Sequence, residues 1–160
     1  RPGWLPGPAL LSVLAAVTTF RVSAFRAAGG FSPRLWLGGE EELLSIDMAT
    51  AGWWACWVED IRVHHAPSRN RDTRQRRRLG LRNTLWTLWL RRPVRSAARR
   101  SAEVLAGAPK DRATARAVLA AVAGAPWVLT ERRVVPDPVE RNLRMLEEPQ
   151  RHSRARQYVG

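Results

Sequence analysis

The chain has 160 residues, enough for one domain with a hydrophobic core, and its 45% hydrophobic content excludes an intrinsically disordered protein. Its 27 basic and 14 acidic residues give a formal net charge of +13, which predicts attraction to polyanions: nucleic acid, anionic lipid or phosphorylated substrates. The single cysteine, Cys56, excludes an internal disulfide and a cysteine-rich metal site, and no apolar run is long enough for a membrane span.

The first part of the chain has the order strand, helix, helix, strand. The apolar run Leu10–Val22 predicts a buried strand, and Ser23 can cap a short helix that runs to Ala28. A second helix is expected over Glu40–Ala51, because acids in the first turn favour a helix start and Gly52 favours a stop. Residues 53–65 are rich in Trp, Val and Ile, which predicts another strand. This order indicates an α/β fold.

The remainder of the chain predicts helices. One helix is expected from Asp72 to Arg91, ended by Pro93, and three Ala/Arg-rich helices follow within residues 95–109, 111–126 and 138–149. The tail after residue 149 is expected to be frayed. We therefore expect two parts, an α/β part over 1–92 and a helical extension over 93–160. Because the chain starts without Met, we expect it to be an internal fragment.

Three consecutive carboxylates, Glu40, Glu41 and Glu42, follow the pair Gly38-Gly39. One interpretation is a solvated helix start whose acids stabilise the helix dipole. The other is a catalytic cluster, because paired glycines let backbone approach a ligand closely. Asp47 lies on the same helix face as Glu40, and an acid on an otherwise apolar stripe is either paired or lines a cleft. Asp47 is therefore a candidate binding residue.

Other candidates follow the same pattern of two interpretations. His64 and His65 are either surface histidines or include a metal ligand. Only one of them could be that ligand, because adjacent residues of a strand face opposite sides of the sheet. The run from Arg69 to Arg82 is either a solvated basic face or a diphosphate clamp, with Arg78 and Arg82 as binding candidates.

The tryptophans suggest two further kinds of contact. The first is a third interpretation of the arginine-rich helix: it could lie on an anionic lipid surface, with Trp86 and Trp89 at the level of the headgroups. Most of the tryptophans are expected in the core. Trp36, in the loop before the acids, is the best candidate for a ligand contact.

Taken in order, residues 21–65 resemble the C-terminal half of the catalytic domain of family-two glycosyltransferases of the GT-A fold. "RVSAFRAAGGF" at 21–31 is similar to the family's R-x-x-A-F-x-x-x-G-G-F helix. Glu40-Glu41 falls on its Glu-Asp pair, counted back from Ala51-Gly52, and "VHH" at 63–65 is similar to its strand end. The resemblance covers about residues 10–92. It implies a partial GT-A (Rossmann-like) α/β domain followed by the helical extension.

The resemblance also implies a chemistry. An inverting enzyme of this kind transfers a sugar from a nucleotide-sugar donor to an acceptor hydroxyl, with Glu41 as general base and Glu40 orienting it or the acceptor. His65 would be a metal or diphosphate contact and Arg78 a diphosphate clamp. The cofactor would be Mg²⁺ or Mn²⁺, held mainly by an Asp-x-Asp motif in an N-terminal half that this chain lacks. We therefore expect the isolated fragment to have little or no activity.

Two alternatives stay open beside the enzyme. A basic module that binds nucleic acid or a membrane surface without catalysis fits the charge, and a partner-binding helical domain fits residues 93–160. The enzyme interpretation is preferred, with a glycan, lipid or cell-wall acceptor and no nucleic-acid partner. Its expected location is the cytoplasm, peripheral on the inner face of the cell membrane.

Overall fold

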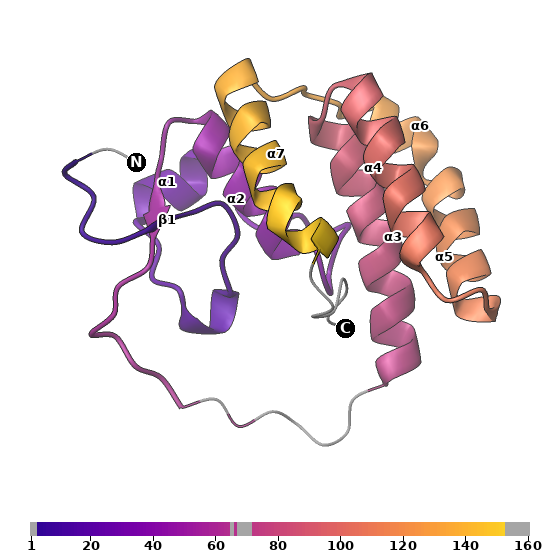
Figure 1. The fold of residues 1–160 in the computed structure, drawn as a ribbon, viewed down its shortest axis with the longest axis horizontal. Helices are drawn as coiled ribbons and strands as arrows, with labels where there is room; N and C mark the ends of the chain where they lie inside the picture. The colour runs from indigo at the N-terminus through magenta and orange to yellow at the C-terminus, as the bar shows by residue number, and fades with distance from the viewer. Residues whose placement is uncertain (1–2, 65, 67–71, 153–160) are drawn as a thin grey trace.

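The computed structural model describes residues 3–64, 66 and 72–152, without the side chains of 149–152, and is mostly helical (Figure 1). The N-terminal part contains the 3₁₀ helix η1 (Ala15–Val17) and the helices α1 (Val22–Ala27) and α2 (Glu40–Thr50). The C-terminal part contains α3 (Thr73–Arg91), α4 (Val94–Gly107), α5 (Arg112–Ala123), α6 (Ala125–Thr130) and α7 (Asp137–His152).

The predicted α/β fold is wrong. In the described part of the chain the strands are only β1 (Ala9–Leu10) and β2 (Ala55–Cys56), which form one antiparallel pair. A GT-A or Rossmann-like domain needs a multi-stranded sheet, which the described residues do not contain. Apolar residues expected in the two strands, such as Leu14 and Ile61, are instead exposed. β-propensity depends on packing against neighbouring strands, and these segments have none beyond their mutual pair.

Most of the helix predictions are confirmed, because their start and stop signals act locally. The Asp72 side chain accepts a hydrogen bond from the Gln75 backbone N–H at 2.9 Å and caps α3. Pro93 follows the end of α3, and Gly52, with φ of 83°, follows the end of α2. Helix α6 was not predicted: it begins at Ala125, directly after Gly124 ends α5, and Pro126 lies in its first turn. The tail was expected to fray after residue 149, but α7 continues to His152; the rest of the expected tail, 153–160, lies outside the described residues.

Helix α3 is the centre of the molecule, with α4 and α5 against one side and α2 against another (Figure 1). Helices α4 and α5 form one core with it, where Leu81 and Leu85 of α3 meet Val104 and Ala117. A second core joins the N-terminal part to the other helices. In it, Leu35 and Leu43 pack with Trp86 and Leu90 of α3 and with Val128 of α6.

Helix α7 lies between the N-terminal part and the α3–α6 helices (Figure 1). On one side, Val139 and Leu143 pack with Ile46 of α2. On the other side it is held by charge: Arg92 pairs with Glu140 and Glu147, each at 2.5 Å, and all three side chains are buried. A buried arginine tolerates this position because both of its neighbours are carboxylates.

Candidate functional site

Glu41, the predicted base, lies at the N-terminal end of α2. Its Oε1 accepts a hydrogen bond from the Ala15 backbone N–H at 2.5 Å, so it caps η1 from a distant part of the sequence. The Ser45 hydroxyl donates to the Glu41 carbonyl at 2.7 Å, one turn further along the same face of α2. One oxygen of the Glu41 carboxylate is therefore held by backbone, while the residue as a whole is partly exposed to solvent.

Glu40 and Glu42 lie on either side of Glu41, and all three residues are half-buried. The Glu40 Oε2 atom is buried and has no hydrogen-bond partner in the described part of the chain. Burial raises the pKa of Glu42, against the lowering effect of Arg92 and Arg100, while Glu147 adds to the increase. Glu42 is therefore electrostatically part of the charged contact among α2, α4 and α7.

Asp47, predicted to bind substrate, is paired within the protein. Its two carboxylate oxygens accept hydrogen bonds from Arg91 Nε at 2.5 Å and Nη2 at 2.9 Å. The sequence predicted that Asp47 would either be paired or line a cleft, and the structure shows that it is paired. The Asp47–Arg91 pair connects α2 to the end of α3, so its geometry serves the fold.

Gly38 and Gly39 both have left-handed backbone, with φ of 81° and 91°. The close backbone approach that they predict does occur, but the neighbour is α3. A Cβ on Gly39 would lie 3.1 Å from the Asn83 Cβ. The fully buried Asn83 amide donates to the Leu35 carbonyl at 2.6 Å and to the Gly38 carbonyl at 2.5 Å. These hydrogen bonds hold the loop before α2 on α3.

Trp36 lies in this loop with its side chain in solvent. It is 69% exposed and has φ of 49°, the one non-glycine residue with positive φ among those described. Left-handed backbone at a bulky residue costs about 1–2 kcal/mol, and such strain clusters at functional sites. An exposed indole in a strained loop suits a stacking contact with a ligand.

Arg82, Trp86 and Trp89 belong to the interior contacts of α3. The Arg82 guanidinium lies 4.2 Å from the centre of the Trp86 ring, and burial, followed by the charge of Arg78, lowers the pKa of Arg82. Trp86 is buried and donates to the Ala121 carbonyl at 2.9 Å, and Trp89 donates to the Ser101 hydroxyl at 3.1 Å. These two tryptophans therefore do not form an outer face of α3.

The remaining candidates are Arg78 and the two histidines. Arg78 lines a basic groove at the N-terminal ends of α3 and α5. His65 lies outside the described residues, and His64 is exposed. Within the described ranges, no group of three or more His, Cys, Asp or Glu side chains is arranged to hold a metal ion.

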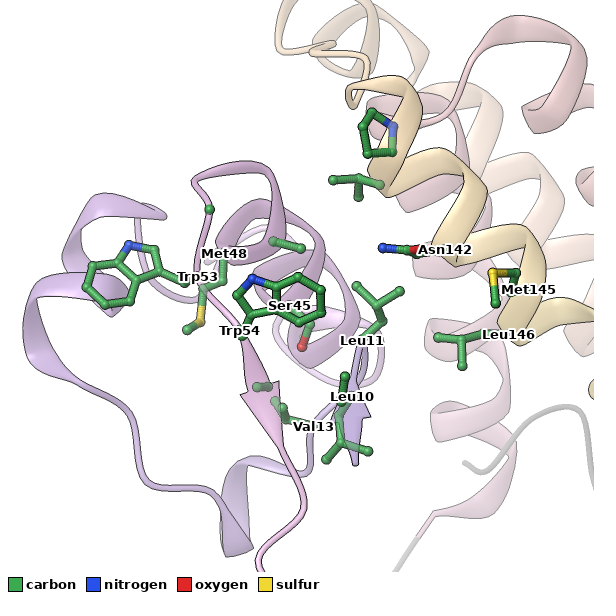
Figure 2. A pocket seen from close by; sticks show the side chains of 16 residues that line it. Leu10, Leu11, Val13, Ser45, Met48, Trp53, Trp54, Asn142, Met145 and Leu146 are labelled. Atoms are coloured by element: carbon green, nitrogen blue, oxygen red, sulfur yellow. The ribbon is translucent and has the colours of Figure 1, made fainter. Parts of the chain in front are cut away.

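A pocket that the sequence did not predict opens beside α2. It has a volume of about 500 Å³ and is lined mainly by apolar side chains from residues 9–13, from α2, from residues 52–55 and from α7. Figure 2 shows Leu10 and Leu11 on the side facing α7, from which Asn142 and Leu146 extend toward them. The exposed Trp54, Met145 and Leu146 were a signal for it, because large apolar side chains on one surface often border a site.

Glu41 is not a lining residue, but two contacts link it to residues at the pocket. Ser45 lines the pocket and its hydroxyl donates to the Glu41 carbonyl. Val13 also lines the pocket, two residues before Ala15, whose N–H donates to the Glu41 carboxylate. A carboxylate at the edge of an apolar pocket can accept a proton from a hydroxyl group on an apolar ligand.

Comparison with known proteins gives no relative: no protein-family model, no curated protein and no solved structure matches this chain. Among the described helices, none combines the length and apolar character that crossing a membrane requires.

Proposed function

We propose that this chain contributes the acceptor side of a sugar transferase, with Glu41 as the general base. Two lines of support are independent of each other. The first is the ordered resemblance of residues 21–65 to the family-two glycosyltransferases, in which Glu41 takes the position of the base. The second is the environment of Glu41. The proposal no longer includes a GT-A sheet, because the described strands form a single pair.

The observation that carries the proposal is the difference among the acids of α2. Asp47 is bound by Arg91, Glu42 faces the charges of Arg92 and Arg100, and one oxygen of Glu40 is buried. Glu41 instead receives a backbone hydrogen bond on one carboxylate oxygen, and its backbone carbonyl accepts from Ser45, which lines an apolar pocket. A general base needs a fixed carboxylate that a substrate hydroxyl can reach, and Glu41 meets this need better than its neighbours.

The pocket favours an acceptor alcohol with an apolar body, such as a lipid, over a free sugar. Its volume of about 500 Å³ and its Leu, Val, Met and Trp lining suit a hydrocarbon chain. With the chain in the pocket, the hydroxyl end would lie toward Ser45 and Glu41. Trp36, in the strained loop before α2, is available to stack on the sugar being transferred.

The reaction has one displacement step. Glu41 takes the proton of the acceptor hydroxyl while that oxygen forms a bond to the anomeric carbon of the donor. The bond from the anomeric carbon to the diphosphate breaks, and nucleoside diphosphate leaves with the electron pair. A divalent metal such as Mg²⁺ or Mn²⁺ would neutralise that diphosphate, but the described residues provide no metal-binding group, so no step relies on one.

The test is nucleotide release by the full-length gene product with UDP-, GDP- and TDP-sugars, Mg²⁺ or Mn²⁺, and either a long-chain alcohol or a soluble sugar as acceptor. Glu41→Gln keeps an oxygen for the Ala15 N–H but cannot take a proton, so kcat should fall about 10²–10⁴-fold. Glu59→Gln, at an exposed acid outside α2, is the matched control and should keep its rate. Unchanged turnover in Glu41→Gln would assign the base elsewhere, and absence of nucleotide release with every donor would reject sugar transfer.

A second candidate function is binding without catalysis, as a basic helical module. The observation that favours it is the groove at the N-terminal ends of α3 and α5, whose lining includes five arginines. The two candidates separate in the same experiment, because a binding module releases no nucleotide from any sugar donor.

A further inference from the structure

The outer face of α5 is apolar and uncovered. Leu119 and Val122 are 69% and 66% exposed, and Leu129 of α6 is 66% exposed. Arg112, Arg116 and Leu119 follow one another at helical spacing, so they share one face of α5. The opposite face carries Ala117 and packs into the core. The exposed face therefore has arginines at its N-terminal end and aliphatic side chains along the rest.

The arginine end of this face joins a groove of about 670 Å³ between α3 and α5. The two helices run side by side in the same direction, because Arg77 pairs with Asp111 near their starts and Trp86 bonds to the Ala121 carbonyl near their ends. The groove is lined by arginines from both helices, namely Arg74, Arg77, Arg78, Arg112 and Arg116.

Among the described residues, Arg77 is the one of these five arginines that pairs with a carboxylate. The carboxylates in the groove are Asp72 and Asp111, which cap α3 and α5. Asp111 also pairs with Arg77. Within the described residues, no hydrogen bond or ion pair joins the other groove arginines, Arg74, Arg78, Arg112 and Arg116, to a partner. Clustered guanidinium groups without carboxylates match the oxygens of phosphate groups.

We infer that the outer face of α5 and α6, together with this groove, binds an anionic lipid surface. A lipid surface satisfies both halves of the face, because its phosphates match the arginines and its acyl region accepts Leu119, Val122 and Leu129. A nucleic acid would satisfy the arginines and leave the aliphatic side chains in water. Arg112 and Arg116 connect the two halves, since they line the groove and lie on the apolar face.

The orientation follows from these positions. Helix α5 lies along the plane of the interface, its aliphatic side chains enter the boundary between headgroups and acyl chains, and the groove arginines face lipid phosphates. This surface is not the lipid-facing surface of α3 that the sequence suggested, because Trp86 and Trp89 make hydrogen bonds inside the protein. It is also independent of the sugar-transfer proposal, because lipid binding needs no turnover.

The test is co-sedimentation of the whole chain with vesicles of phosphatidylglycerol and phosphatidylcholine in equal parts, compared with phosphatidylcholine alone. Wild type should bind the anionic vesicles and bind the neutral ones much more weakly. Arg112→Gln/Arg116→Gln should weaken binding about 25-fold, at roughly fivefold per arginine. Leu119→Ser/Val122→Ser should weaken it about tenfold or more, because less apolar surface enters the interface.

Matched controls keep composition and net charge equal. Arg95→Gln/Arg141→Gln removes two exposed arginines elsewhere, and Leu105→Ser/Val94→Ser removes two exposed aliphatic side chains elsewhere. Both should bind nearly as wild type does. Three results would overturn the inference: no binding to anionic vesicles, unchanged binding of Leu119→Ser/Val122→Ser, or displacement from vesicles by inorganic pyrophosphate at constant ionic strength. The last result would assign the groove to free phosphates.

Discussion

Asp47 and Arg91 form a two-point ion pair, with Arg91 Nε at 2.5 Å from one carboxylate oxygen and Nη2 at 2.9 Å from the other. Arg91 also donates to the Glu131 carbonyl at 3.4 Å, so one guanidinium connects α2, α3 and the segment after α6. An acid that the sequence presented as a binding candidate is thus a structural contact between distant segments.

We expect Asp47→Asn to lower the free energy of unfolding by about 3 kcal/mol, because it leaves the buried Arg91 guanidinium without a counter-charge. Glu131→Gln is the control, since Glu131 pairs with Arg34 at 3.6 Å and both side chains are about half exposed. Its change should be about 0.5 kcal/mol or less. Urea denaturation of each variant measures both values. Equal small changes would mean that the Asp47–Arg91 pair contributes little.

Gly39→Ala should destabilise the protein by about 2–3 kcal/mol, because it adds strained left-handed backbone and a close contact. The added Cβ would lie 3.1 Å from the Asn83 Cβ. Gly29→Ala is the matched control, since its φ of 86° is nearly the same and no atom lies within 4 Å of the added Cβ. It should lose about 1 kcal/mol from backbone strain alone. Equal losses in thermal denaturation would remove the packing argument.

Glu140 should contribute stability that depends on pH. Burial alone would raise its pKa, but hydrogen bonds from Arg92, Ser96 and Arg144 together lower the pKa below its ordinary 4.5. Its contribution is therefore complete above pH 4.5 and is lost as the pH falls through the folded-state pKa. Glu140→Gln should cost about 3 kcal/mol at pH 7. The difference between wild type and variant should shrink in melts taken below pH 4.5. A constant difference across pH would contradict this.

The contribution of Glu42 to stability should change with pH in the opposite direction. Burial raises the pKa of Glu42 above its ordinary 4.5, so the folded protein holds this proton more tightly than the unfolded chain. Stability therefore falls as the pH rises from 4.5 through the raised pKa. Glu42→Gln removes this cost, so the variant should be more stable than wild type at pH 7 and equal to it at pH 4. Melting temperatures at both pH values measure the effect. A less stable variant at pH 7 would indicate that the Glu42 charge is stabilised by Arg92 and Arg100.

The candidate site was predictable only in part. Glu40, Glu41 and Glu42 were singled out by their place behind Gly38-Gly39, and Glu41 among them by the family resemblance; the link from Glu41 to the pocket is through Ser45. The pocket itself was not predictable, because residues 9–13, α2 and α7 are far apart in the sequence. The internal partners of Asp47 and Gly39 were equally hidden, since Arg91 and Asn83 belong to a helix that follows them by more than forty residues.

The sequence by itself determined the positions of most helices, because caps such as Asp72 and stops such as Gly52 and Pro93 act through neighbouring backbone groups. Only the tertiary structure decided whether the β-prone runs became strands, since a strand needs a partner to satisfy its hydrogen bonds. The tertiary structure also decided which charges are buried. Asp47, Glu42 and Glu140 each look like ordinary helix acids along the chain, but the fold pairs Asp47 and Glu140 with arginines and buries Glu42.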